Sequence, residues 1–355
     1  MKKIFALILT ILITTSLLTG CMGTTVVIGN CTCPPESHQQ PTAPAEGAVK
    51  LGLSVTTKIS DSVSATAESA GKAAYDLTLA AVLVDDRGVI LDCIIDSVPA
   101  TVKFDATGAI TTALDLAVLT KNEQGANYGM VAHGNAKYEW DVQVAEVAKY
   151  AIGKTVDQLK NGDIDMVSGK AKDGTDLSSK ATIYLAGYVY AIEAAVNNAI
   201  HLGAQAGDEL VLTTLNSIGS SVSATEEKNG TIQLDCEIVA LTRNDGKITS
   251  CYIDSVQAKI SIDATGTITT DLTAPVKTKN QLGADYGMVA WGGAKYEWDR
   301  QAAEFASYVT GKTAQEVADI AISESTKPAD GTDLSTTVTI SIAGFQALIA
   351  KAMAQ

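Results

Sequence analysis

The sequence predicts an α+β protein made of two tandem homologous domains, each an antiparallel β-sheet with helices packed on it. Three observations support this prediction. The chain repeats itself, each repeat begins with β-branched and apolar runs separated by turn motifs, and each ends with apolar residues at helical spacing. Strands followed by segregated helices are typical of the α+β class.

Short motifs that recur about 158 residues apart define the repeat. Tyr128-Gly-Met-Val-Ala recurs from Tyr286, and Asp173-Gly-Thr-Asp-Leu-Ser recurs from Asp330 after the spacing has fallen by one residue. This period exceeds the roughly 20 to 50 residues of solenoid repeats and matches an ordinary domain. The predicted domains are residues 49–202 and 205–355.

The first half of each repeat is predicted to be strand-rich. Runs of β-branched and apolar residues are separated by Asp-Arg-Gly and Asp-Ala-Thr-Gly, which are turn signals, so adjacent runs are expected to form antiparallel hairpins. In the first repeat the predicted strands are 77–84, 89–98, 101–104 and 109–112.

The second half of each repeat is predicted to be helical. Apolar residues step at helical spacing through 140–152 and stop at Gly153, and the equivalent helix covers 301–309 and stops at Gly311. The last segment alternates like a strand at 181–185 but then steps like a helix. We expect a helix over about 178–199.

The N-terminus predicts a bacterial lipoprotein signal. Residues 1–20 contain two lysines and an apolar run too short to span a bilayer, and Leu-Thr-Gly precedes Cys21. Leu18-Thr-Gly-Cys resembles a lipobox, which implies that Cys21 is acylated (palmitate or a similar chain) and anchors the protein to the extracytoplasmic face of the cell membrane. An ordinary secretory signal is the alternative.

Residues 21–48 are rich in proline and polar residues and are predicted to form a tether. The formal net charge is −14, and cleavage after residue 20 removes two further positive charges. Since nucleic-acid binding requires a basic surface, a nucleic-acid partner is excluded.

The cysteines and histidines do not define a shared metal or disulfide site. At a spacing of 158, Cys93 corresponds to Cys251, whereas Cys236 corresponds to Thr78. Cys236 and Cys251 are expected on neighbouring strands but out of direct register, so buried free thiols are preferred to a disulfide. The three histidines are not repeat-equivalent, which makes a duplicated histidine metal site improbable.

The closing phrase of each repeat is the strongest indication of function. The phrase from Asp173 is followed by Thr182, the phrase from Asp330 by Thr339, and both threonines precede an Ala-rich apolar segment. A threonine hydroxyl is therefore expected where a helix begins and where backbone N–H groups can receive a phosphate. A capped loop-to-helix junction, with Asp or Ser as the cap, is the structural alternative.

Taken together, the order of these motifs resembles the FMN-binding repeats of surface lipoproteins used in extracellular electron transfer, which are related distantly to the flavin-carrying subunits of sodium-pumping and ferredoxin-linked oxidoreductases. In that family an FMN transferase moves FMN from FAD onto the last threonine of Asp-x-x-Ser-Gly-Ala-Thr. The resemblance implies one or two covalent FMN groups. The matching positions are Thr182 and Thr339 for the ester bond, with Asp176, Ser179, Asp333 and Thr336 in the motif.

Both motifs depart from the family pattern where glycine is expected, since Lys180 and Thr337 stand there, and Val338 also replaces alanine. Glycine permits close approach of the backbone to a phosphate. Lys180 could pair with that phosphate and Thr337 could not, so flavin is expected at Thr182 before Thr339.

Two other duplicated features have alternative interpretations. The aromatic residues of each repeat either close a core or stack on a flavin ring, with the core preferred. Gly153-Lys-Thr and Gly311-Lys-Thr lack the earlier glycine of a phosphate loop and are interpreted as helix stops. The aromatic residues are Tyr128, Tyr138, Trp140, Tyr286, Tyr296 and Trp298.

Three classes of function follow. The first is an electron carrier that receives electrons from a membrane donor and passes them to an extracellular acceptor. The second is a ligand-binding or adhesion lipoprotein that kept the fold without flavin. The third is a surface flavoenzyme, for which the sequence supplies no substrate site; no Ser/His/Asp or Cys/His set recurs in both repeats.

Overall fold

The computed structural model describes residues 47–355, which all belong to one compact unit. Each repeat contributes a three-stranded antiparallel sheet, in the orders β1-β2-β3 and β6-β7-β8. This mixture of helices with antiparallel sheets confirms the α+β prediction. The strands are β1 (Lys50–Lys58), β2 (Gly71–Val84), β3 (Ile90–Phe104), β6 (Glu209–Ser217), β7 (Gly230–Asn244) and β8 (Lys247–Ile262).

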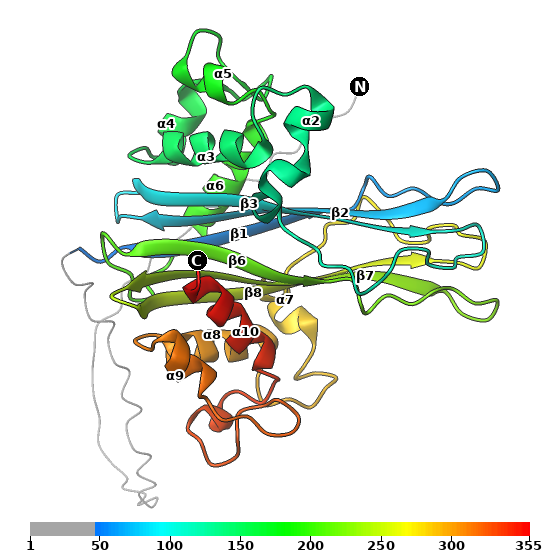
Figure 1. Cartoon of the computed structure of the whole chain (residues 1–355). Helices are drawn as coiled ribbons and strands as arrows, with labels where there is room; N and C mark the ends of the chain where they lie inside the picture. The colour runs from blue at the N-terminus through cyan, green and yellow to red at the C-terminus, as the bar shows by residue number, and fades with distance from the viewer. Residues whose placement is uncertain (1–46) are drawn as a thin grey trace, which may run out of the picture. The chain divides into compact units, whose positions relative to one another are not determined.

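Helices cover the outer face of each sheet (Figure 1). The first repeat contains α1 (Lys121–Gln124), η1 (Gly125–Tyr128), α2 (Met130–Gly134), α3 (Trp140–Ala151), α4 (Val156–Asn161), α5 (Asp176–Lys180) and α6 (Ala186–Asn197), with a small ribbon of β4 (Ile164–Asp165) and β5 (Lys170–Ala171). The second contains α7 (Lys279–Leu282), η2 (Gly283–Tyr286), α8 (Trp298–Val309), α9 (Ala314–Ala318), η3 (Leu334–Thr336) and α10 (Ala343–Met353).

The inner faces of the two sheets pack on each other and form one shared core. Alternate residues of β2, such as Leu77 and Leu79, meet Leu234 and Ile238 of β7 in a single cluster of buried side chains. The intervening residues of β2 face α3 and α6 instead, in a second cluster. Because the central layer is built from both repeats, the expectation of two tandem domains is not confirmed.

The two repeats also interlock through their Asp-Ala-Thr-Gly turns, which are turns as predicted. The amide of Ala65 donates to the carbonyl of Gly266 at 2.8 Å, and the amide of Ala224 donates to the carbonyl of Gly108 at 2.9 Å. The two contacts are reciprocal: each turn binds the loop before the second strand of the other repeat.

The strand predictions were partly correct. Segments 77–84, 90–98 and 101–104 are in strands, so the second prediction began one residue early, and the last two segments form the single strand β3, which continues through Pro99. Proline is tolerated there because β3 is an edge strand. The predicted strand 109–112 is reduced to an isolated bridge at Ile110, and β1 was not predicted.

The helix predicted over 140–152 is confirmed, and the single helix predicted over 178–199 is wrong. Helix α3 ends before Gly153, whose φ is +81°, and α8 ends before Gly311, whose φ is +86°. The helix expected over 178–199 is broken into α5 and α6, since residues 181–185 are not helical. Their amide groups bond elsewhere: Leu185 donates to the carbonyl of Gly169 at 2.6 Å.

The strand register corrects one predicted equivalence. Ser97 pairs with Thr78, and the corresponding Ser255 pairs with Glu237. The counterpart of Thr78 is therefore Glu237 and not Cys236, because the segment from Glu237 to Ser255 is one residue shorter than the segment from Thr78 to Ser97. Cys236 and Cys251 are out of register, as expected, and are free thiols, as is Cys93.

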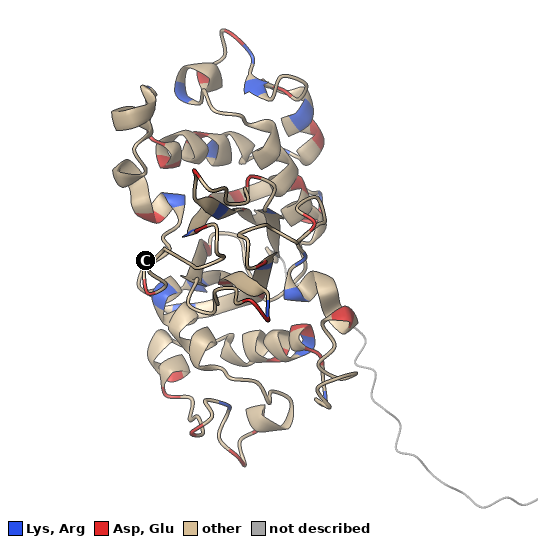
Figure 2. Cartoon of the chain, turned by 90° about the vertical axis from the view of Figure 1, so that its right-hand side faces the viewer, with Lys and Arg blue, Asp and Glu red and all other residues tan. Residues whose placement is uncertain are grey.

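The signal segment, Cys21 and nearly all of the predicted tether lie outside the described residues. Among residues 47–355, no helix combines the length and the apolarity needed to cross a bilayer. Within the same range, no group of three or more histidine, cysteine or acidic side chains is arranged to hold a metal. Basic and acidic residues are interspersed along the helices and turns in Figure 2.

Candidate functional site

Thr182 and Thr339 occupy the same place in the two repeats and are both exposed. Thr182 follows α5, and Thr339 follows η3. The amide of Thr182 donates to Gln143 Oε1 at 2.8 Å, and its hydroxyl lies 3.2 Å from the same oxygen. Thr339 makes the same two bonds with Gln301, at 2.7 and 3.2 Å. A buried glutamine therefore fixes each threonine, and the threonine itself remains exposed to solvent.

Gln143 and Gln301 were missed from the sequence. Each is completely buried on the inner side of its helix, and each also donates its amide to a backbone carbonyl, of Tyr138 at 2.9 Å and of Tyr296 at 2.8 Å. Burying an amide is unfavourable unless its hydrogen bonds are satisfied. A glutamine on the apolar face of a predicted helix, repeated at the spacing of 158, was the signal available.

The other motif residues form local turns. Asp176 begins α5 and is exposed, and the Ser179 hydroxyl donates to its carbonyl at 2.8 Å. In the second repeat Asp333 precedes η3, and the Thr336 hydroxyl donates to its carbonyl at 2.7 Å. The structure thus places these four residues in the turns that lead to the threonines.

Two predictions about the junction are wrong. The cap of α5 is Thr175, whose hydroxyl accepts from the amide of Ser178 at 3.2 Å, and not an Asp or Ser. Thr182 is also not at the start of a helix, and its amide is already bonded to Gln143. A phosphate site made of helical N–H groups is therefore not formed there.

Lys180, expected to face a phosphate, is bonded to two carboxylates. Its ammonium lies 3.0 Å from Asp176 and 3.2 Å from Glu146. Hydrogen bonds to these acids raise the pKa of Lys180. Its charge is thus largely compensated within the protein.

A cavity of about 330 Å³ lies beside Thr182. It has the size of a small-molecule pocket, for which roughly 300 to 1,000 Å³ is typical. The residues after Thr182 form part of its wall. The lining residues are Thr78, Lys121, Tyr128, Met130, Trp140, Ile183, Tyr184, Gly187 and Tyr188.

Two aromatic side chains in the wall of this cavity contact each other. The rings of Trp140 and Tyr188 meet edge to face with centroids 5.9 Å apart, and the Trp140 indole donates to the Tyr188 hydroxyl at 2.9 Å. Trp140 is only 3% exposed and also belongs to the core beneath α3. Trp140 therefore packs in a core, which was the preferred alternative, and the same side chain also lines the cavity.

A buried ammonium group also lines the cavity. Lys121 is 8% exposed, and its Nζ lies 5.2 Å from the Tyr128 ring and 5.1 Å from the Trp140 ring. Its nearest carboxylate, Asp76, is 3.7 Å away. A cation held between aromatic faces is stabilised by the ring quadrupoles, and Asp76 compensates part of its charge.

The repeated Ile-Asp-Ser-Val motif positions this lysine. Asp96 is 6% exposed and accepts bonds from the amides of Ser97 at 2.7 Å and Asn122 at 3.1 Å, so it holds the start of α1. Burial raises the pKa of Asp96 to about 6, although these hydrogen bonds act in the opposite direction. Asp254 has the same role before α7, and its pKa is likewise raised to about 6 by burial.

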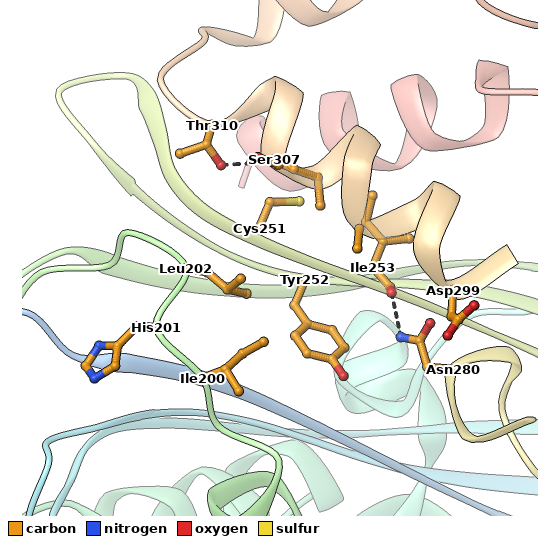
Figure 3. A pocket seen from close by; sticks show the side chains of 12 residues that line it. Ile200, His201, Leu202, Cys251, Tyr252, Ile253, Asn280, Asp299, Ser307 and Thr310 are labelled. Atoms are coloured by element: carbon orange, nitrogen blue, oxygen red, sulfur yellow. Dashed lines mark hydrogen bonds between the residues drawn. The ribbon is translucent and has the colours of Figure 1, made fainter. Parts of the chain in front are cut away.

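Two further cavities occupy equivalent places between the sheet and the following helix of each repeat. The cavity in the first repeat measures about 260 Å³, and the one in the second about 670 Å³. In Figure 3, Asn280 and Asp299 lie side by side at one end of the larger cavity, and Ile200 and Leu202 from the segment between the repeats lie beside Tyr252. Ser307 replaces the longer Lys149 of the first repeat and leaves more space.

Comparison of the chain with family models, curated proteins and solved structures gave no match.

Proposed function

We propose that this protein is a lipid-anchored extracytoplasmic flavoprotein that carries FMN esterified to Thr182, and with lower occupancy to Thr339, and that relays electrons. The proposal rests on the motif resemblance together with one observation. An exposed threonine hydroxyl, fixed by a buried glutamine, lies beside a cavity with aromatic walls and a buried ammonium group.

The residues present fit FMN. The Thr182 side chain is exposed, as attachment by a second protein requires. The adjacent cavity is lined by aromatic side chains, of which Tyr184 is 58% exposed and can receive a planar aromatic group. Lys121 offers a positive charge to an electron-rich edge or to the phosphate. Gln143 holds Thr182 directly before Ile183 and Tyr184, which line the cavity.

The attachment step balances with FAD as the donor. The Thr182 oxygen forms a bond to the phosphorus of the FMN half, the phosphoanhydride bond to the AMP half breaks, and AMP leaves with the bonding electrons while the hydroxyl proton passes to solvent. When bound, FMN would supply reversible electron transfer, and the protein would supply attachment, orientation and adjustment of its potential. The proposed partners are an FMN transferase, a membrane electron donor and an extracellular acceptor, with Cys21 anchoring the chain in the bilayer.

Threonine variants test the proposal. The full chain is co-expressed with an FMN transferase in a bacterial envelope and analysed by visible spectrum and mass after denaturation. Thr182→Ala should remove most of the covalent flavin and the double variant with Thr339→Ala all of it, whereas Thr182→Ser should retain a hydroxyl acceptor. Thr107→Ala, in an exposed turn, is the control. Undiminished covalent flavin in the double variant would falsify the assignment.

The larger cavity favours a second candidate function, binding of a small amphiphilic ligand without flavin. About 670 Å³ is ample for such a ligand, and the cavity combines apolar walls with the polar groups of Asn280 and Asp299. Ser307→Lys introduces the residue of the first repeat and should fill this space. A ligand that raises the melting temperature of the native chain but not that of this variant would support ligand binding in this cavity. Equal shifts in both proteins would show that the ligand does not bind there.

A further inference from the structure

The two repeats differ at one position of the aromatic cavity. The strand register makes Glu237 the counterpart of Thr78, which lines the cavity beside Thr182. Gly344 in α10 likewise corresponds to Gly187 in α6, the glycine that lines the same cavity. A short hydroxyl side chain in the first repeat is thus replaced by a long carboxylate in the second.

The Glu237 carboxylate crosses to the opposite wall. A Cβ atom placed on Gly344 would lie 2.5 Å from Glu237 Oε2 and 2.9 Å from Oε1. A Cβ atom on Gly187 would meet only the Tyr184 ring, at 3.8 Å. The carboxylate therefore occupies, against Gly344, the space that is open between Thr78 and Gly187 in the first repeat.

A lysine also lies near this carboxylate in the second repeat, although Lys279 is half-buried whereas Lys121 is buried. Lys279 lies between Tyr286 and Trp298, with Nζ at 5.3 and 4.9 Å from their ring centres, as Lys121 does in the first repeat. Burial raises the pKa of Glu237, and the charge of Lys279 opposes this effect. Glu237 is thus close enough to Lys279 to be affected by its charge, whereas the carboxylate beside Lys121 is Asp76, at 3.7 Å.

The residue beside Lys121 explains why the first site does not close in the same way. Asp76 accepts a bond from the Ser97 hydroxyl at 2.8 Å, which holds it on the strand. Its counterpart Asp235 is bonded to Gln233 and Gln257, at 2.7 and 3.1 Å. Neither aspartate reaches the glycine of the helix, so Glu237 is the group that distinguishes the two sites.

Building on the proposed function, we infer that Glu237 makes the repeats unequal flavin sites: the first can hold a flavin ring in its aromatic cavity, whereas the carboxylate of Glu237 excludes the ring from the second. A flavin attached at Thr339 therefore stays in solvent, and the second repeat serves the first as part of the shared core.

Reciprocal exchange of the two residues tests this inference in the full chain co-expressed with an FMN transferase. Thr78→Glu should lower flavin attachment at Thr182 about tenfold. If attachment is unchanged, the fraction of flavin rings quenched by Trp140 should fall by the same factor. A tenfold change corresponds to roughly 1.4 kcal/mol in the free energy of binding the ring. Glu237→Thr should increase attachment or quenching at Thr339 by a similar factor. Glu237→Gln keeps the size of the side chain and should leave the second site closed. Peptide mapping assigns each flavin, and melting curves confirm that each variant is folded.

The outcomes separate this inference from the function on which it rests. A wild-type chain without flavin at either threonine contradicts both. A wild-type chain labelled at Thr182, together with folded exchange variants whose flavin content and fluorescence match the wild type, contradicts the role of Glu237 alone. Equal quenching of flavins at Thr182 and Thr339 in the wild type also contradicts the role of Glu237.

Discussion

At the scale of single residues, one buried glutamine holds each threonine: Gln143 accepts from the amide of Thr182 at 2.8 Å, and Gln301 from the amide of Thr339 at 2.7 Å. Thr182 and Thr339 were found because a short motif recurs, and the structure places both in the same exposed position. Gln143 was overlooked because a polar residue within a helix is usually assigned to the solvent face. Its two contacts, with Thr182 and Tyr138, join segments that no local pattern connects.

Replacement of Gln143 tests its role at the threonine. Gln143→Met keeps the volume but leaves the amide of Thr182 and the carbonyl of Tyr138 without a partner, so we expect a loss of about 1 to 3 kcal/mol in the free energy of unfolding. Flavin attachment at Thr182 should also fall. Gln301→Met is the matched control, since it should affect Thr339 and spare Thr182. Unchanged stability and labelling in Gln143→Met would contradict this role.

The buried aspartates predict a pH dependence. Since the folded pKa of Asp96 is about 6 and the ordinary value is 3.8, its contribution to stability is fully present below about pH 3.8 and is lost as the pH rises through 6. Asp96→Asn cannot titrate. The free energy of unfolding of the variant, relative to the wild type, should therefore increase by about 2 kcal/mol between pH 4 and pH 7. Urea unfolding at several pH values measures this, and a constant difference would show that the pKa of Asp96 is not raised.

At the scale of elements, the periodicity of apolar residues was sufficient to predict α3. It was insufficient for elements whose bounds depend on tertiary contacts. Strand β1 was missed although its residues alternate, and Gly52 within it weakens a strand pattern. The structure explains this glycine, because a Cβ there would lie 2.1 Å from the carbonyl of Ala195 in α6. The break between α5 and α6 was equally hidden, since the acceptor for Thr182 lies on another helix.

The Gly-Lys-Thr motifs act as a helix stop followed by a cap. Thr155 accepts from the amide of Gln158 in a capping box at the start of α4, and Thr313 does the same before α9. Thr155→Ala should destabilise the protein by about 1 kcal/mol, whereas Thr155→Ser should remain close to the wild type. Thermal unfolding compares the three proteins. Equal stability of the alanine and serine variants would show that the hydroxyl does not cap α4.

At the scale of the whole molecule, the shared core was the feature that the sequence did not indicate. The run from Ala80 to Val84 is continuously apolar, which is typical of a strand buried on both faces. The sequence of this strand does not indicate which element covers its second face. The structure shows that the other repeat covers it, and the interlocked turns at Gly108 and Gly266 fix the arrangement.

Two turn glycines separate the contact between repeats from backbone strain. Gly108 and Gly88 both have positive φ, at +70° and +80°. A Cβ on Gly108 would lie 2.5 Å from the carbonyl oxygen of Asp263, whereas a Cβ on Gly88 would have no other atom within 4 Å. Gly88→Ala should cost about 1 kcal/mol through strain, and Gly108→Ala about 1 to 3 kcal/mol more. Both should unfold in one transition seen alike by tryptophan fluorescence and circular dichroism. Equal losses, or separate transitions, would contradict the interlocked arrangement.

The most direct test of the central claim is the intact mass of the denatured wild-type protein after co-expression with an FMN transferase, followed by peptide mapping. The structure and the motif resemblance predict a yellow protein that carries one principal FMN ester at Thr182. An unmodified mass, in cells where a known substrate of the same transferase is labelled, would contradict the flavoprotein assignment and leave ligand binding as the function to pursue.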